Sequence, residues 1–236
     1  MRWIPLVISL GLAGCVATVE PSQPTQPAPA KTVRKAIPKP TNADVSRFKS
    51  VVQRVEPVAE QQCRARTRGA NCDFRIVVDS RPNQPPNAFQ TLDKQGRPIL
   101  AFNLGLIASV RNQDELAFVM GHEASHHIRG HIARQQQNAA AGALILGGLA
   151  AITGAGSSTV RSATDLGASV GARTYSKEFE LEADALGTLI TKQAGYNPVR
   201  GAEFFTQLPD PGNRFLGTHP PNAQRMETVR RVNAGL

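Results

Sequence analysis

The segment Gly121–His127 restricts what this chain can form more than any other feature of its sequence. It contains the pattern H-E-x-x-H, with His122, Glu123 and His126 at the defining positions. Residues four apart on a helix share a face, so both imidazoles can bind one Zn²⁺ while the glutamate acts on the attacking water. The pattern therefore predicts a helix that carries a peptide-cleaving zinc site. The alternative is a chance match between ordinary surface or core residues.

The residues before this motif carry the signals of a helix start. Asn112 is a favoured N-cap residue, and Glu115 stands three positions later, as in a capping box. Leu116, Val119 and Met120 then supply an apolar stripe at helical spacing. We therefore expect the motif in the middle of a helix.

Length and charge limit the domain count and the partners. A chain of 236 residues is long enough for one sizeable domain with accessory segments. The net charge of +9 is dispersed, with no Lys/Arg run longer than two, and only 5% of residues are aromatic. These features argue against a nucleic-acid partner. The charge suits an anionic membrane surface or acidic polymers, or serves solubility alone.

The first fourteen residues have the layout of a secretory signal peptide. Arg2 precedes an apolar run from Trp3 to Leu12, too short to span a membrane stably, and small residues lead to Cys15. This ending resembles the lipobox of bacterial lipoproteins, in which cleavage leaves Cys15 as a lipid-modified N-terminus. By the same resemblance, an aspartate directly after the cysteine is associated with retention in the inner membrane. This chain has Val16 at that position, so the outer membrane is expected. The alternative is a plain signal peptide with an incidental cysteine.

Residues 15–41 are predicted to form a lipidated, proline-rich tether. Six prolines with Gln, Thr and Ala cannot bury enough apolar surface to offset the ordering entropy of the chain. Its basic end either lies against lipid head groups or is simply solvated. The expected organisation is a signal peptide (1–14), the tether (15–41) and a zinc metallopeptidase domain (42–236).

The domain is expected to open with helical segments. Apolar residues repeat at helical spacing from Val45 to Val55, and we interpret them as core. Pro57 ends this helix, and residues 58–66 form a further helical piece.

Cys63 and Cys72 are the cysteines that remain once Cys15 carries lipid. In an oxidising periplasm we expect them to form a disulfide that ties the helix to a strand at residues 74–79. Metal binding by the pair is the lesser alternative, because no histidine lies nearby in sequence.

Two short apolar segments, residues 87–91 and 98–102, flank a polar turn that contains Gly96. This pattern predicts a β-hairpin, followed by a short helix at 103–110. A strand that passes the metal would offer unpaired backbone groups to an extended substrate.

Residues 139–156 are apolar and rich in Ala and Gly, with five glycines in eighteen residues. This length is the lower limit for a membrane span, and large side chains are few. We expect the segment to extend the zinc helix and fold back through residues 157–173 as a lid, or to touch the membrane surface.

A catalytic zinc needs three protein ligands and an open position, so the two histidines require a partner. Glu180 is the obvious candidate, and Asp184 lies one helical turn later on the same face. One carboxylate can bind the metal while the other orients a ligand imidazole. The alternative is a solvent-facing acidic helix that exposes Glu178 and Glu182.

The motifs of this chain resemble those of the HtpX-like zinc peptidases, relatives of the CAAX prenyl endopeptidases. The likeness covers residues 45–232 and rests on motifs at 87–89, 121–126, 176–184 and 218–225, in that order. It implies an α+β gluzincin domain, mainly helical, with a small β-sheet over the active-site cleft. The sequence departs from the family at Lys177, where arginine is usual, and at residues 90–93, which replace a small glycine-containing turn.

The same resemblance assigns roles to individual residues. His122, His126 and Glu180 bind a single zinc, Glu123 is the general base, and Asp184 orients a ligand. The substrate-binding residues that it implies are Asn87, Ala88 and Phe89.

His219 is presented by Thr218-His-Pro-Pro221, before a helix expected at 222–233. The prolines restrict the backbone around it. The histidine either donates a hydrogen bond to the developing oxyanion or occupies the open zinc position at rest. The alternative is a surface histidine at a helix start.

The sequence thus predicts a zinc-dependent endopeptidase that cleaves extended or misfolded protein segments and is lipid-anchored to the outer membrane, facing the periplasm. The mechanism is metal-assisted hydrolysis with no Ser or Cys nucleophile. The alternative function is a chaperone-like module that holds outer-membrane protein clients with little proteolysis. A purely structural zinc is disfavoured, because closed sites use four Cys/His ligands. Neither the physiological substrate nor the oligomeric state follows from the sequence.

Overall fold

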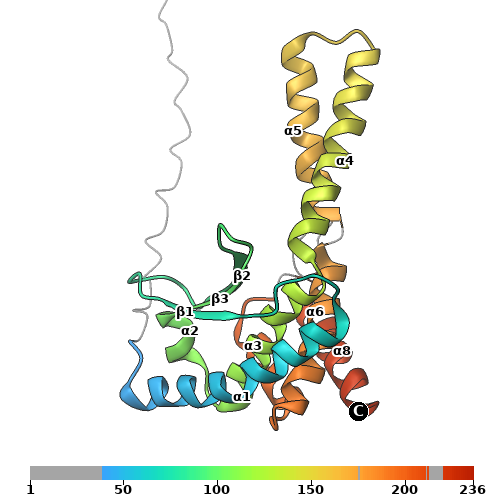
Figure 1. Cartoon of the computed structure of the whole chain (residues 1–236). Coiled ribbons are helices and arrows are strands. Elements are labelled where there is room, and N and C mark those ends of the chain that lie inside the picture. Colours follow the sequence, from blue (N-terminus) through green and yellow to red (C-terminus); the bar gives the residue numbers. More distant parts are fainter. Residues whose placement is uncertain (1–38, 175, 211, 213–219) are drawn as a thin grey trace, which may run out of the picture. The chain divides into compact units, whose positions relative to one another are not determined.

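A computed structural model describes residues 39–174, 176–210, 212 and 220–236. Helices form most of this part of the chain, together with one small sheet, which confirms the expected α+β class (Figure 1). In chain order the elements are α1 (Asn42–Arg66), β1 (Arg75–Asp79), β2 (Ala88–Leu92), β3 (Pro98–Asn103), α2 (Leu104–Ser109), α3 (Gln113–Ile128), α4 (His131–Ile152), α5 (Ser157–Thr174), α6 (Ser176–Gln193), α7 (Pro198–Ala202), the 3-10 helix η1 (Glu203–Gln207) and α8 (Asn222–Ala234).

Helix α1 is a single helix, so the expected end at Pro57 is wrong. A capping box starts it: the Thr41 hydroxyl accepts from the Asp44 amide, and the Asp44 carboxylate accepts from the Thr41 amide. A proline inside a helix removes one backbone hydrogen bond. The buried face of α1 nevertheless continues on both sides of it, through Val55 and Ala59, and we attribute the unbroken helix to this packing.

Most of the apolar positions that were expected in the core are buried. Phe48 and Val55 of α1 lie in the core, where Phe48 meets Phe102 of β3 edge to face with ring centroids 5.4 Å apart. Val45 was expected there too, but its side chain is 42% exposed because the first turn of α1 extends past the core.

The sheet has the strand order β1-β3-β2, with the buried strand β3 in the centre. Strand β1 pairs with β3 in parallel, and β2 pairs with it antiparallel, which confirms the predicted hairpin. In the connecting turn, the Asp93 carboxylate accepts from the amides of Gln95 and Arg97, and Gly96 takes a left-handed conformation with φ of 78°. This order leaves β2 as an edge strand.

The predicted disulfide between Cys63 and Cys72 is present, with a Cα–Cα distance of 5.6 Å. It links the last turn of α1 to the segment that enters β1. Next to it, the Asn71 carbonyl lies 2.7 Å from Nε2 of His127, at the end of α3.

Helix α3 starts as predicted, with the Asn112 side chain accepting from the Glu115 amide at 3.0 Å. The Glu115 carboxylate is buried and accepts from the Arg111 amide. Helix α6 packs closely on α3: a Cβ added at Gly187 would lie 3.0 Å from the backbone nitrogen of His122. Such a contact favours glycine and sets side chains of the two helices beside each other.

The expectation that residues 139–156 extend the zinc helix is wrong. Helix α3 ends at Ile128, and Gly130 takes a left-handed conformation with φ of 66°, after which α4 starts as a separate helix. Helices α4 and α5 then form the expected fold-back, side by side (Figure 1). They approach so closely that a Cβ on Gly142 would lie 2.1 Å from the Gly167 carbonyl oxygen. Gly142 and Gly147 therefore serve helix–helix contact, because a Cβ on either would meet α5.

The outer face of α4 exposes large apolar side chains, among them Leu144 at 77% and Ile152 at 82%. Within the described ranges, no helix combines the length and apolarity needed to cross a bilayer.

Candidate active site

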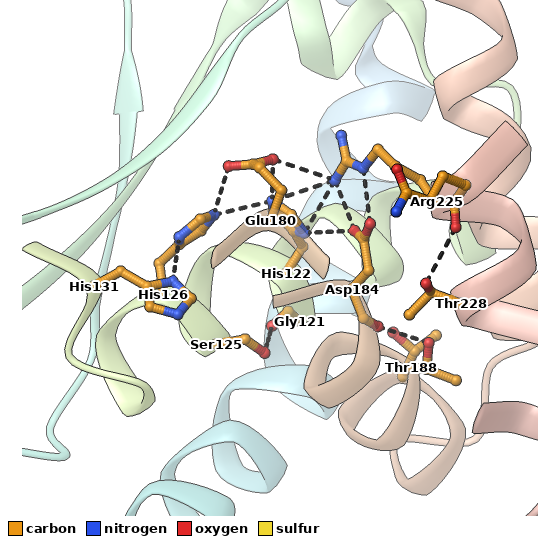
Figure 2. Close-up of polar contacts among 12 residues, drawn as sticks. Gly121, His122, Ser125, His126, His131, Glu180, Asp184, Thr188, Arg225 and Thr228 are labelled. Atoms are coloured by element: carbon orange, nitrogen blue, oxygen red, sulfur yellow. Dashed lines mark hydrogen bonds and ion pairs between the residues drawn. The ribbon is translucent and has the colours of Figure 1, made fainter. Parts of the chain in front are cut away.

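One group of donor atoms in the described part of the chain suits a metal ion: one atom each from His122, His126 and Glu180, all within 4.8 Å of one another. The histidines lie one turn apart on α3, and Glu180 comes from the neighbouring α6. The two Nε2 atoms are 3.0 Å apart, and each lies 3.5 Å from one carboxylate oxygen of Glu180 (Figure 2). The three residues predicted as ligands are thus brought together.

This donor set fits zinc. Two imidazole nitrogens and one carboxylate are a ligand set of catalytic zinc sites, which keep one further position open. The Nδ1 atoms of both histidines have other partners, so the Nε2 atoms are left for the ion.

The first histidine is held by a buried ion pair. Nδ1 of His122 lies 2.9 Å from Asp184, which was predicted to orient a ligand. Arg225 of α8 donates to both oxygens of this carboxylate, at 2.8 and 2.6 Å, and its guanidinium lies 3.5 Å from the centroid of the Phe205 ring. A ligand imidazole that donates to a carboxylate is fixed in tautomer and orientation. Arg225 is the cationic partner of that carboxylate inside the protein.

The same contacts determine how His122 holds a proton. Burial lowers the pKa of this imidazole, but its interactions with Asp184 and Glu180 outweigh burial and raise the pKa above the ordinary value. A metal ion that binds Nε2 has to displace a proton, so affinity is expected to fall in acid.

The second histidine is held differently. Nδ1 of His126 lies 2.8 Å from Nδ1 of His131, the first residue of α4. Nε2 of His131 lies 3.3 Å from Glu182, which also accepts two bonds from Arg134. Among the described residues, no carboxylate bonds to Nδ1 of His126, so the imidazole of His131 lies between this histidine and the acid.

Glu123, between the ligand histidines, lines the same cavity as they do. Burial raises the pKa of its carboxyl group from 4.5 to about 7, although His122, Arg225 and the Gln90 backbone amide oppose the shift. A carboxylate with a pKa near neutrality suits a general base, because it takes up a proton readily at the working pH.

The cavity has a volume of about 370 Å³ and is bordered by β2 on one side. Asn87, Ala88 and Phe89, the predicted substrate-binding residues, all line it. Asn87 bonds to Asn103, its amide to the side chain and its carbonyl to the backbone amide. Backbone groups in an antiparallel pair alternate in direction, so those of Ala88 and Gln90 face away from β3. The Gln90 backbone amide lowers the pKa of the Glu123 carboxyl group, and Gln90 lines the cavity, so this edge faces the site.

Two predicted residues, Cys15 and His219, lie outside the described residues, and their roles stay predictions. Sequence reasoning missed three others: His131, Arg134 and Glu182. Glu182 was weighed as an exposed member of an acidic helix, yet it bonds to both of the others. The spacing of His131 and Arg134, one turn apart, was visible, but the approach of His131 to His126 depends on the left-handed turn at Gly130.

Comparison with known proteins finds peptidases. The sequence pattern of Peptidase family M48 matches residues 46–233. A Vibrio cholerae protein inferred to be a beta-barrel assembly-enhancing protease is 32% identical over 174 residues, which is 64% of this chain and 34% of that protein. The beta-barrel assembly-enhancing protease of Escherichia coli K12 is 30% identical over 50% of this chain and 27% of its own length. The yeast mitochondrial metalloendopeptidase OMA1 is 28% identical over 68% of this chain and 47% of its own. The matched part thus spans less than half of each relative.

Proposed function

Since this chain belongs to Peptidase family M48, we propose that it is a zinc-dependent endopeptidase that cleaves extended or misfolded protein segments in the bacterial cell envelope. One observation supports the activity above all others. The metal-binding atoms of His122, His126 and Glu180 all lie within 4.8 Å of one another, and Glu123 lines the same cavity. Three ligands with a carboxylate base beside them are what metal-assisted hydrolysis requires.

In this mechanism, zinc bound by the three ligands would act as a Lewis acid that activates water and polarises the scissile carbonyl. Glu123 takes the proton of the attacking water and passes it to the leaving amine. The raised pKa of its carboxyl group, about 7, lets it do both. Asp184 and Arg225 hold His122 in place throughout, because their ion pair is buried.

The free edge of β2 is the proposed binding strand for the substrate. An extended peptide can add to an exposed strand edge through main-chain hydrogen bonds. Backbone groups of Ala88 and Gln90 face away from β3, and both residues line the cavity. Such binding depends more on the substrate backbone than on its side chains, so it suits unfolded segments of varied sequence.

The experiment that tests this function compares one protein in two states. The purified full chain with zinc is incubated with a model protein that is reduced and alkylated so that it stays unfolded, and with the same protein in its native form. We expect internal cuts, mapped by mass spectrometry, in the unfolded form alone. A chelator should stop them, and added zinc should restore them.

The same experiment distinguishes the peptidase function from the alternative, chaperone-like function. A chaperone-like module would bind the unfolded protein and leave it intact with or without zinc. That outcome would contradict the peptidase proposal.

We also propose a lipid-anchored, HtpX-like form, with a signal peptide (1–14) and a tether (15–41) that place the domain (42–236) at the outer membrane facing the periplasm. The lipobox resemblance at Cys15 supports the anchor. Relatives named for beta-barrel assembly support an envelope location.

Replacement of the acylated cysteine tests this location. We expect Cys15→Ser protein to lose the lipid and to leave the membrane fraction, because the acyl chains on this cysteine are the proposed anchor. Fractionation of cells and mass measurement of the N-terminus check this. A variant that is processed and membrane-bound like the wild type would refute the anchor.

A further inference from the structure

His131 is a buried histidine that the mechanism described so far does not use. The residue is 4% exposed, and it starts α4 directly after the left-handed Gly130. After this turn of the chain, its ring lies beside His126, with the two ring centroids 4.9 Å apart. The ring also stacks on Phe179 of α6, with centroids 4.6 Å apart and planes inclined by 10°. Both neighbours therefore fix its orientation.

The contacts of His131 form a chain that ends in an arginine. Its Nδ1 lies 2.8 Å from Nδ1 of His126, and its Nε2 lies 3.3 Å from Glu182 (Figure 2 shows the first contact). Arg134 donates to both oxygens of Glu182, at 2.7 and 3.1 Å, and lies over the Phe179 ring. We call His131, Glu182 and Arg134 the relay.

One arrangement of protons satisfies every contact when His126 binds an ion through Nε2. The His126 proton is then on Nδ1 and can only be donated, so Nδ1 of His131 has to accept it. A neutral His131 consequently carries its own proton on Nε2, which points to the Glu182 carboxylate. The geometry thus matches a donor-to-acceptor sequence from His126 to Glu182.

The two ligand histidines are supported in parallel ways. Nδ1 of His122 meets Asp184, which is paired with Arg225; Nδ1 of His126 meets His131, which meets Glu182, paired with Arg134. The difference lies in exposure, since the Asp184 side chain is fully buried and that of Glu182 is 35% exposed. Solvent screening makes the outer acid the weaker of the two.

We propose that His131 is a positioning residue for the ligand His126: it accepts the Nδ1 proton and, held in turn by Glu182, keeps the ring with Nε2 towards the ion. Partners of this kind commonly change metal affinity or activity ten- to a hundredfold when removed. The proposal rests on the zinc site of the proposed function. It also links the first turn of α4 to the metal centre.

The test is His131→Phe, which keeps a ring against Phe179 and removes both nitrogens. Zn²⁺ affinity, measured by competition with a chromophoric chelator, is expected to fall about ten- to a hundredfold. The visible spectrum of the Co²⁺-substituted protein should shift, because the second ligand ring is no longer held. His131→Asn, whose amide oxygen can accept from His126, should restore part of the affinity.

His127→Phe is the matched control, since this histidine neighbours a ligand and yet contacts the Asn71 carbonyl instead of the site. Its affinity and Co²⁺ spectrum should equal those of the wild type. Glu182→Gln keeps the stacked imidazole, and a smaller loss of affinity is expected from it. This variant decides the matter if His131→Phe does not fold.

These measurements test the positioning role of His131 separately from the proposed zinc peptidase function. Wild-type protein that binds no Zn²⁺ would overturn the proposed function. Wild-type protein that binds Zn²⁺, with affinity and spectrum unchanged in the folded His131→Phe and Glu182→Gln variants, would overturn the positioning role alone.

Discussion

Glu123→Gln protein is expected to bind zinc as the wild type does and to lose peptide hydrolysis by on the order of a thousandfold, within the usual contribution of a general base. Glutamine has nearly the same size but cannot take a proton from water. Glu123 lines the cavity without belonging to the ligand group, so its replacement leaves the three donors in place. The measurement is kcat/KM on a mapped unfolded substrate, with zinc content determined on the same sample.

A second glutamate serves as the control for this prediction. Glu178→Gln changes another glutamate, an exposed one on α6, and should leave both quantities unchanged. If Glu123→Gln protein cleaves at the wild-type rate, a different base or a different mechanism is at work.

Glu180→Ala is expected to lower zinc affinity by more than a hundredfold, since loss of a supporting partner alone costs about ten- to a hundredfold and Glu180 is proposed as a ligand itself. Two histidines would remain, with their Nε2 atoms 3.0 Å apart. Arg225, whose guanidinium lies 3.5 Å from Glu180, would then face the ion with less negative charge between them. Hydrolysis should fall with the zinc.

Metal analysis after dialysis against a weak chelator measures this loss. The Glu178→Gln protein again serves as the control, two residues away on the same helix. Normal zinc content in folded Glu180→Ala protein would remove Glu180 from the ligand set.

Much of the fold could be predicted because its signals are local. The Asn112 cap, the apolar stripe of α3 and the Gly96 turn each act within a few residues, and the structure has all three features. The predicted helix end at Pro57 was wrong for the opposite reason. Its local effect is to end a helix, whereas packing on both sides of it keeps α1 whole.

The site was predictable in part. The spacing of His122 and His126 places both on one helix face, and the spacing of Glu180 and Asp184 does the same on α6. The relay was not visible, because the approach of His131 to His126 is set by a left-handed glycine and by the position of α6. Contacts of this kind depend on chain path, which residue spacing alone does not record.

The most direct test of the central claim is diffraction from crystals of the zinc-loaded Glu123→Gln protein, with data collected on both sides of the zinc absorption edge. The account predicts one anomalous peak per chain, bounded by Nε2 of His122, Nε2 of His126 and the Glu180 carboxylate. A peak elsewhere, or zinc held without Glu180, would contradict it.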